Sequence, residues 1–227
     1  MSLPVMLFAA GFGTRMGALT RHCPKPLIPV AGRPLIAHTV DLARAAGGDP
    51  LVANTHYLAD QMRTYLEPRG ILISDEQPEI LDTGGGLRQA LPLLGSGPVI
   101  TMNTDAIWDG PNPVELALSQ WDPDRMDALL VCVPLPRAAG RKGGGDFSAD
   151  EQRRITRGGN LVYGGVQILD PSGLRQIPDQ TFSLNLLWNE MLETGRLFAV
   201  EYPGRWCDVG HPEGIALAEA VLRGDYV

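Results

Sequence analysis

A glycine-rich turn follows the first apolar run of the chain, Val5 to Ala9, and could hold phosphate groups. The turn reads Ala-Gly-Phe-Gly-Thr-Arg over positions 10–15. Glycine lets backbone N–H groups approach phosphate oxygens closely. A dinucleotide fingerprint would need glycine where Met16 stands, and a P-loop would need a Lys-Ser/Thr pair that is missing here. The turn therefore predicts a phosphate site of another kind.

Charge is distributed unevenly along the 227 residues. The formal net charge of −7 argues against a nucleic-acid-binding surface. All 26 acidic residues lie at Asp41 or later, whereas the segment before it carries Arg15, Arg21, Lys25 and Arg33. Such a basic segment in an acidic protein suits a small polyanionic ligand. A chance run of basic residues near one end of the chain is an equally simple interpretation.

Composition and cysteine usage favour a globular protein. Hydrophobic residues make up 44% of the chain and charged residues 20%. Cys23, Cys132 and Cys207 are widely spaced, so they predict neither a disulfide framework nor a structural zinc site. The apolar start is short and has no basic residue ahead of it, which fits a buried strand better than a signal peptide. Since no apolar run approaches the ~20 residues of a membrane helix, we expect a cytoplasmic protein with neither membrane nor nucleic-acid partners.

Apolar strand-like runs alternate with helical patterns as far as Val133. We expect strands at residues 5–9, 51–53, 71–73, 99–102 and 128–133, and helices at residues 34–47, 58–66 and 87–94. Further strands are expected at residues 161–169 and 197–202, and further helices at residues 184–193 and 212–222. This order predicts an α/β fold with a doubly wound, mostly parallel sheet.

The alternation stops after Val133. Residues 134–150 are rich in glycine and basic residues, which is typical of a long loop. Long loops in compact domains are often functional. We therefore expect residues 1–227 to form a single domain that carries a small insertion over residues 134–165.

Residues 9–36 resemble the sugar-phosphate nucleotidyltransferase family. The family signature is a loop AAGxGTRM followed by PKPLxPVxGxPL, and the chain matches it almost without interruption. The resemblance implies a Rossmann-like nucleotidyltransferase fold in which the glycine loop wraps a nucleoside triphosphate. It assigns catalytic roles to Arg15 and Lys25. The residues of the loop that it assigns to nucleotide binding are Ala10, Gly11, Gly13 and Thr14.

Two carboxylates far apart in the sequence also fit the family pattern. Asp105 closes the run Asn-Thr-Asp at residues 103–105, and Asp208 lies in a segment at residues 206–210 that is similar to WxDVG. By resemblance, Asp105 and Asp208 together hold a catalytic Mg²⁺ ion. This ion prefers oxygen ligands and commonly takes one or two carboxylates with phosphates and waters. A plain turn or a helix cap is the alternative role for each aspartate.

Three short segments resemble the branch of the family that transfers a uridylyl group to N-acetylmuramic acid 1-phosphate, a reaction of peptidoglycan recycling. The first is Thr-Gly-Gly-Gly at residues 83–86, which we expect to be a loop that reads the nucleobase. The other two, at residues 145–147 and 163–165, are expected beside the sugar. The resemblance adds Gln77, Thr83, Gly84 and Gly85 to the nucleotide-binding residues. It assigns Asn103, Asp146 and Gly165 to the sugar.

The resemblance implies that a nucleoside triphosphate and a sugar 1-phosphate form a nucleotide-sugar and pyrophosphate, with UTP and N-acetylmuramic acid 1-phosphate as the expected pair. A phosphate monoester has its second pKa near ~6, so it needs no general base. Mannose or glucose 1-phosphate with GTP, dTTP or UTP is the alternative within the same class. A non-catalytic sensor of nucleotide-sugars is an alternative from a different class. The presence of Lys25, Asp105 and Asp208 together argues against a sensor.

Overall fold

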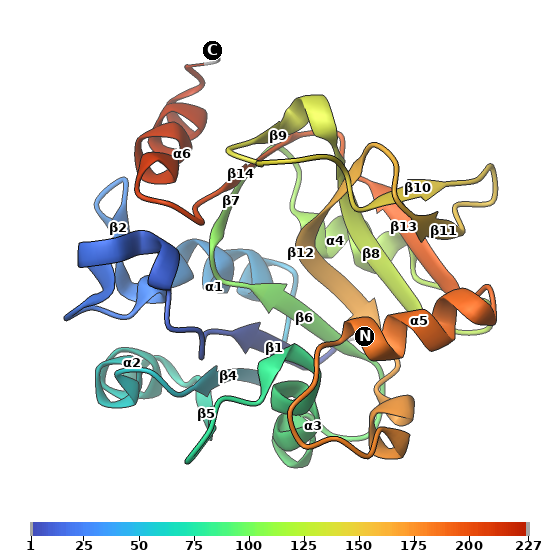
Figure 1. Cartoon of the computed structure of the whole chain (residues 1–227), viewed down its shortest axis with the longest axis horizontal. Helices are drawn as coiled ribbons and strands as arrows, with labels where there is room; N and C mark the ends of the chain where they lie inside the picture. Colours follow the sequence, from blue (N-terminus) through green and yellow to red (C-terminus); the bar gives the residue numbers. More distant parts are fainter. Residues whose placement is uncertain (1, 226–227) are drawn as a thin grey trace.

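Strand β1 lies in the middle of the main sheet of the computed structural model, which describes residues 2–225 (Figure 1). It pairs in parallel with β4 on one side and with β6 on the other, and β5 extends the sheet in parallel beyond β4. The bounds are Val5–Phe8 for β1, Leu51–Thr55 for β4, Leu72–Asp75 for β5 and Val99–Asn103 for β6. After β1 the chain thus adds β4 and β5 on one side of it and then returns to add β6 on the other side.

The sheet continues beyond β6 through β12, β8 and β13. Strand β12 runs antiparallel to both β6 and β8, whereas β13 is parallel to β8. The bounds are Ala128–Pro134 for β8, Leu161–Leu169 for β12 and Leu197–Glu201 for β13. Among these seven strands β12 alone is reversed. The expected α/β fold with a mostly parallel sheet is therefore confirmed.

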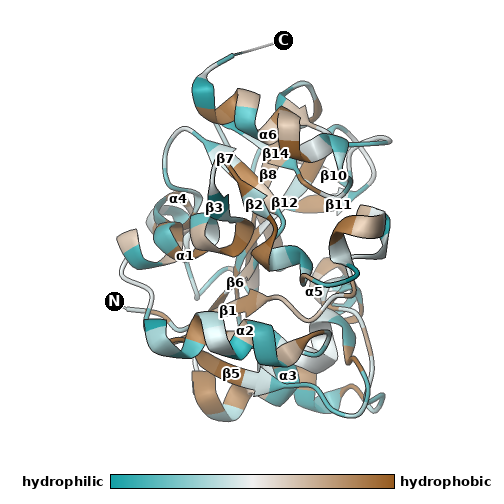
Figure 2. Cartoon of the chain, turned by 90° about the vertical axis from the view of Figure 1, so that its left-hand side faces the viewer, coloured by the Kyte–Doolittle hydropathy of each residue, from teal (hydrophilic) through white to brown (hydrophobic). Residues whose placement is uncertain are grey.

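Helices cover both faces of this sheet, as expected for a doubly wound fold. Successive residues of a strand point to opposite faces, so Val5 and Leu7 pack on one side of β1 and Met6 on the other. The first face is covered by α1 (Leu35–Ala45), α2 (Ala59–Leu66) and α4 (Pro113–Gln120). The second face is covered by α3 (Asp82–Leu94) and α5 (Asn185–Glu193). Figure 2 shows the hydrophobic colours concentrated in the sheet, while α2 at the surface is mainly hydrophilic.

A small sheet returns the end of the chain to the carboxyl end of β6. Strand β14 pairs antiparallel with β7 and in parallel with β9, and α6 packs on this sheet (Figure 1). The bounds are Ala106–Asp109 for β7, Ala138–Ala139 for β9, Arg205–Asp208 for β14 and Glu213–Arg223 for α6. In the register of this sheet, Asp208 lies opposite Ala106. This pairing places Asp208 beside the residue that follows Asp105.

The segment 134–165, which the sequence analysis expects to be a loop or insertion, contains short strands. A hairpin of β10 (Phe147–Ala149) and β11 (Ile155–Arg157) joins the edge of β12 at one residue pair. The remaining short elements are β2 (Pro29–Val30), β3 (Arg33–Pro34), and the 3-10 helices η1 (Thr14–Thr20), η2 (Lys25–Leu27), η3 (Glu67–Arg69), η4 (Leu135–Arg137) and η5 (Ser172–Gln176). Within residues 2–225, every helix is too short or too polar to cross a membrane.

The glycine run at residues 84–86 belongs to a helix, so the expected loop at this place is wrong. Helix α3 begins at Asp82, and the three glycines are buried in its first turns. The backbone N–H groups of Gly84 and Gly85 donate to the carbonyl oxygen of Phe182 at 2.9 and 3.1 Å. The N-terminal end of α3 is thereby hydrogen-bonded to the segment before α5.

Close packing explains why glycine occupies these positions. A Cβ atom at Gly84 would lie 2.3 Å from the Phe182 ring, and one at Gly85 would lie 2.5 Å from the carbonyl oxygen of Gln180. At Gly86 the nearest atom would be Oε1 of Glu76, at 2.3 Å. The sequence does not predict this packing, because Gln180 and Phe182 are distant from the glycines in the chain.

We expect Gly84→Ala to destabilise the protein, although alanine normally favours a helix by about 1 kcal/mol over glycine. The added methyl group would overlap the Phe182 ring, so α3 or the facing segment must shift at a cost of about 1–3 kcal/mol. Urea unfolding measures this change. Gly97→Ala is the matched control, because a Cβ there would meet no atom within 4 Å. Equal unfolding free energies for the two variants would contradict this packing role.

Candidate active site

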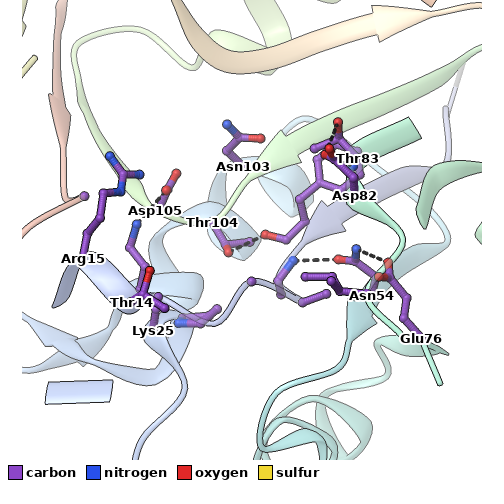
Figure 3. Close-up of a pocket in the computed structure, with 18 residues that line it drawn as sticks. Thr14, Arg15, Lys25, Asn54, Glu76, Asp82, Thr83, Asn103, Thr104 and Asp105 are labelled. Atoms are coloured by element: carbon purple, nitrogen blue, oxygen red, sulfur yellow. Dashed lines mark hydrogen bonds and ion pairs between the residues drawn. The ribbon is translucent and has the colours of Figure 1, made fainter. Parts of the chain in front are cut away.

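A cavity of about 320 Å³ opens at the carboxyl ends of the parallel strands, beside the point where the chain reverses its direction of winding. Open α/β sheets bind ligands at such a point. Figure 3 shows Arg15, Lys25 and Asp105 gathered toward one end of the cavity and Asp82 and Thr83 toward the other. The sequence-predicted residues that line it are Ala10, Gly11, Gly13, Thr14, Arg15, Lys25, Thr83, Asn103 and Asp105.

The glycine loop presents free backbone donors to this cavity. Gly13 has a φ of 64°, and a Cβ atom there would lie 2.9 Å from both Lys25 and Thr20. Both the left-handed backbone and the close packing therefore require glycine. The hydroxyl of Thr20 donates to the carbonyl oxygen of Gly13 at 3.1 Å. Among the described residues, no acceptor pairs with the backbone N–H groups of Gly11, Phe12 and Gly13. A loop of this kind suits an anion.

A buried polar network that the sequence analysis missed holds the start of the loop. The backbone N–H of Ala9 donates to Oδ1 of Asn54 at 2.7 Å, and Nδ2 of Asn54 donates to Oε1 of Glu76 at 2.6 Å. The second oxygen of Glu76 accepts from the backbone N–H of Leu81 at 2.7 Å. Burial raises the pKa of Glu76, while these two hydrogen bonds act in the opposite direction. The network connects the ends of β1 and β4 with the start of α3.

The only sequence signal for this network was a polar residue at the end of a strand. Asn54 lies near the end of β4, and Glu76 directly follows β5. Neither residue belongs to a motif that the sequence analysis used. Their partnership depends on the parallel pairing of β4 and β5.

Lys25 and Asp105 form an ion pair at one end of the cavity. The Lys25 ammonium donates to Oδ2 of Asp105 at 2.7 Å, and the two side chains are 11% and 33% exposed. Prolines on both sides of Lys25 restrict its backbone. The hydroxyl of Thr104 donates to the carbonyl oxygen of Phe8 at 2.7 Å, which fixes the segment before Asp105 against β1. The lysine to which the resemblance assigns a catalytic role is thus held by a carboxylate.

Asp208 lies near this ion pair. The backbone N–H of Val209 donates to the carbonyl oxygen of Asp105 at 2.9 Å. A Cβ atom at Gly210 would lie 2.9 Å from Oδ1 of Asp208 and 3.2 Å from Arg15, so the carboxylate and the guanidinium flank this glycine. Burial raises the pKa of Asp208, and the charge of Asp105 raises it further, whereas Lys25, Arg15 and His211 lower it. Gly210 lines the cavity directly.

The two carboxylates fit a magnesium ion. Their mutual repulsion, which helps to raise the pKa of Asp208, would be relieved by a divalent cation. Within residues 2–225 there is no cluster of three or more His, Cys, Asp or Glu side chains that could hold a metal ion by itself. Substrate phosphates and waters would therefore have to complete the coordination shell, as is usual for Mg²⁺.

A second cavity of about 360 Å³ adjoins the first and shares Phe8, Asp82, Thr83 and Asn103 with it. Asp146 lines this cavity, but both of its oxygens are used by the protein. One accepts from Arg141 at 2.5 Å and the other from the backbone N–H of Tyr163 at 2.9 Å. Asp146 therefore fixes the loop that forms this wall.

The other predicted site residues lie behind or outside the cavities. Gly165 has a φ of 90°, and a Cβ atom there would lie 2.7 Å from Asn103, so this glycine lets β12 approach β6 behind Asn103. Gly84 and Gly85 are buried behind Thr83, whose hydroxyl accepts from the backbone N–H of Leu184 at 3.0 Å. Gln77 is exposed and lines neither cavity.

Comparison with known proteins gives one family and closely similar relatives. The family described as MobA-like NTP transferase domain matches residues 5–142. An N-acetylmuramate alpha-1-phosphate uridylyltransferase of Caulobacter vibrioides is 41% identical and aligns over 96% of each chain. The protein of the same name from Neisseria meningitidis serogroup B is 32% identical, over 92% of this chain and 93% of its own length.

The fold is shared with a solved structure, HddC from Yersinia pseudotuberculosis complexed with GMP-PN. The TM-score is 0.77 at 21% sequence identity, over 97% of this chain and 99% of that one. These matches confirm the fold and the family resemblance that the sequence motifs indicate.

Asn54→Ala should lower the free energy of unfolding by about 1–3 kcal/mol, because it leaves the backbone N–H of Ala9 and one oxygen of Glu76 without their buried partner. Asn160→Ala removes the same group from an exposed side chain and should have little effect. Urea unfolding of both variants compares the two sites. A stability of Asn54→Ala within error of the Asn160→Ala value would contradict the structural role of the network.

Asp105→Asn and Asp208→Asn should change stability differently in metal-free buffer. Asp105→Asn leaves the nearly buried Lys25 ammonium without its counter-charge, at a cost of roughly 1–2 kcal/mol given the partial exposure of Asp105. The raised pKa of Asp208 means that the folded state favours the protonated carboxyl over the carboxylate. The stability that the protonated carboxyl contributes is lost as the pH rises through that pKa. Asp208→Asn should therefore unfold at or above the wild-type temperature at neutral pH. Thermal unfolding followed by circular dichroism measures both, and equal destabilisation would contradict this charge arrangement.

Proposed function

The chain belongs to the MobA-like NTP transferase domain family, and we propose that it transfers the uridylyl group of UTP to N-acetylmuramic acid 1-phosphate with release of pyrophosphate. The observation that carries this proposal is the 41% identity, over 96% of each chain, to a protein named for that reaction. The cavity supports it, because donors for phosphates and the carboxylate of Asp105 line it, and Asp208 lies close to Asp105. We place this activity in the cytoplasm and in peptidoglycan recycling as part of the same proposal.

The reaction needs no general base from the protein. An oxygen of the sugar phosphate attacks the α-phosphorus of the nucleotide, and the bond from that phosphorus to the pyrophosphate oxygen breaks. The attacking phosphate is already deprotonated near neutral pH. The free N–H groups of Gly11 and Gly13 and the guanidinium of Arg15 bind the triphosphate, and Lys25 at the cavity wall binds the charge that develops during transfer.

Asp105 and Asp208 are the residues that would hold the metal ion. A Mg²⁺ ion bound there would neutralise phosphate charge and orient the reacting groups. The Lys25 ammonium keeps the Asp105 carboxylate in a fixed position at 2.7 Å, and the backbone hydrogen bond from Val209 keeps the two aspartates adjacent. In this proposal, Ala10 and Thr14 complete the nucleotide loop.

The remaining assignments follow the two cavities. Thr83 is proposed to contact the nucleotide from the start of α3, with Gly84 and Gly85 giving the helix its close packing behind it. On the sugar side, Asn103 would contact the substrate where the cavities meet. Asp146 and Gly165 would act by holding the loop and Asn103 in position. Gln77 would contact the base only if its segment moves, because it lines neither cavity.

The experiment that tests the proposal is a pyrophosphate-release assay on a panel of substrates. UTP, CTP, GTP and dTTP are each combined with the 1-phosphates of N-acetylmuramic acid, glucose and mannose, with Mg²⁺ or with EDTA. We expect UTP with N-acetylmuramic acid 1-phosphate to react fastest, and only with the metal. Preference for GTP with mannose 1-phosphate would overturn the substrate assignment, and binding without any turnover would favour a sensor.

Lys25→Met tests in the same assay whether the Lys25 ammonium accelerates the chemical step. Methionine keeps the length and apolar stem of the side chain but removes the ammonium. Loss of one preorganised donor should lower kcat by roughly 10²–10³-fold. Unchanged kcat with a raised KM would mean that Lys25 contributes to binding alone.

A further inference from the structure

The second cavity contains an arginine that no carboxylate of residues 2–225 pairs with. The charged side chains that line this cavity are Asp82, Arg141, Asp146 and Arg157. Arg141 is paired with Asp146, and Oδ1 of Asp82 accepts from the backbone N–H and the hydroxyl of Thr83. Within the described residues Arg157 forms no ion pair. Its positive charge therefore remains available to a ligand.

Neighbouring side chains hold the guanidinium of Arg157 in one orientation. Its carbon lies 5.1 Å from the centre of the Phe147 ring and 5.7 Å from that of Trp188. Nη2 of Arg157 donates to Oδ1 of Asn189 on α5 at 2.9 Å. A guanidinium has five N–H donors in a planar fork, so several remain free after this single hydrogen bond. An arginine held against aromatic rings in this way is prepared to bind an anion.

The aromatic support beneath Arg157 is itself fixed by buried hydrogen bonds. Nε1 of Trp188 donates to Oε1 of Gln167 at 3.0 Å, and Nε2 of Gln167 donates to the hydroxyl of Thr101 at 3.0 Å. The ring of Trp188 also meets the ring of Tyr163 edge-on, with 5.0 Å between their centres. Gln167 and Thr101 are fully buried. The wall of the cavity at Arg157 is therefore anchored in the main sheet.

Arg141, the other arginine of the cavity, has a different role. Its Nη2 donates to Asp146 at 2.5 Å and its Nε to the carbonyl oxygen of Gly144 at 3.3 Å. These bonds neutralise its charge and close the loop in which it lies. Arg157 is consequently the guanidinium of this cavity that retains an uncompensated charge.

We propose that Arg157 binds a carboxylate carried by the sugar and so makes the enzyme selective for an acidic sugar phosphate over a neutral one. This inference rests on the proposed function. A sugar whose phosphate lies in the first cavity would extend into the second past Asn103, which lines both. N-acetylmuramic acid differs from N-acetylglucosamine by a lactyl ether that ends in a carboxylate. A carboxylate fits the planar fork of arginine with paired, charge-assisted hydrogen bonds.

The test compares two sugar phosphates that differ in this group alone. Pyrophosphate release from UTP is measured with N-acetylmuramic acid 1-phosphate and with N-acetylglucosamine 1-phosphate. We expect Arg157→Gln to lower kcat/KM for the acidic sugar by about 10–100-fold and to leave kcat/KM for the neutral sugar unchanged. Arg157→Lys should be intermediate for the acidic sugar, because it keeps the charge but not the fork.

Arg154→Gln is the matched control. Arg154 lies at an exposed position near the start of β11 and lines neither cavity, so the same loss of charge there should change neither substrate. Thermal unfolding of each variant verifies that Arg157→Gln remains folded, as its exposed position on β11 predicts.

The outcomes separate this inference from the proposed function. Suppose that the wild-type enzyme turns over N-acetylmuramic acid 1-phosphate, but Arg157→Gln loses the same fraction of kcat/KM with both sugars. This result would overturn the role of Arg157 and leave the proposed function standing. Wild-type turnover of a neutral sugar phosphate without turnover of N-acetylmuramic acid 1-phosphate would overturn both. A loss confined to the acidic sugar supports both.

Discussion

The proximity of Asp105 and Asp208 at the carboxyl end of β6 imposes the main constraint on this structure. The carboxylates repel each other, and the partly buried position of Asp208 makes its charge still less favourable. Arg15 and Lys25 provide the opposing charge, and both come from the segment that precedes the first acidic residue of the chain. The uneven charge distribution along the sequence thus has a physical counterpart, because the basic segment folds against the carboxylates.

Bringing these four groups together requires the segment that follows β1 to meet the segment that follows β6 and strand β14. The glycine loop follows β1, and the N–H groups of Gly11, Phe12 and Gly13 have no acceptor within residues 2–225. Strand β14 returns through a small sheet to pair with β7. Backbone hydrogen bonds and glycine packing hold this arrangement. A side chain at Gly13 would press against Lys25, and one at Gly210 would press against Asp208 and Arg15. Fixed positions of this kind let charged groups act on a substrate without reorganising.

The two cavities have different electrostatic designs although they share a wall. In the first, cations and carboxylates are mixed, which suits phosphates bound together with a metal ion. In the second, one arginine is paired and the other is held against aromatic rings. Asn103 lies where they meet, positioned by Gly165 behind it. In the proposed function, binding of the phosphate and selection of the sugar are therefore assigned to different side chains of two adjoining cavities.

The sequence by itself determined the features that depend on neighbouring residues. The alternation of apolar runs predicted the doubly wound sheet, and the nearly continuous motif from Ala9 to Ile36 identified the glycine loop and Lys25. Tertiary structure alone decided which distant groups meet. The partner of Lys25 is 80 residues away, the two partners of Asn54 are 45 and 22 residues away, and the atoms that exclude a side chain at Gly84 belong to Phe182. Such contacts depend on strand order and on the path of connecting segments, which local spacing does not encode. For the same reason the sequence does not predict that the glycines at residues 84–86 lie in a helix, or that Arg157 has no ion-pair partner among residues 2–225.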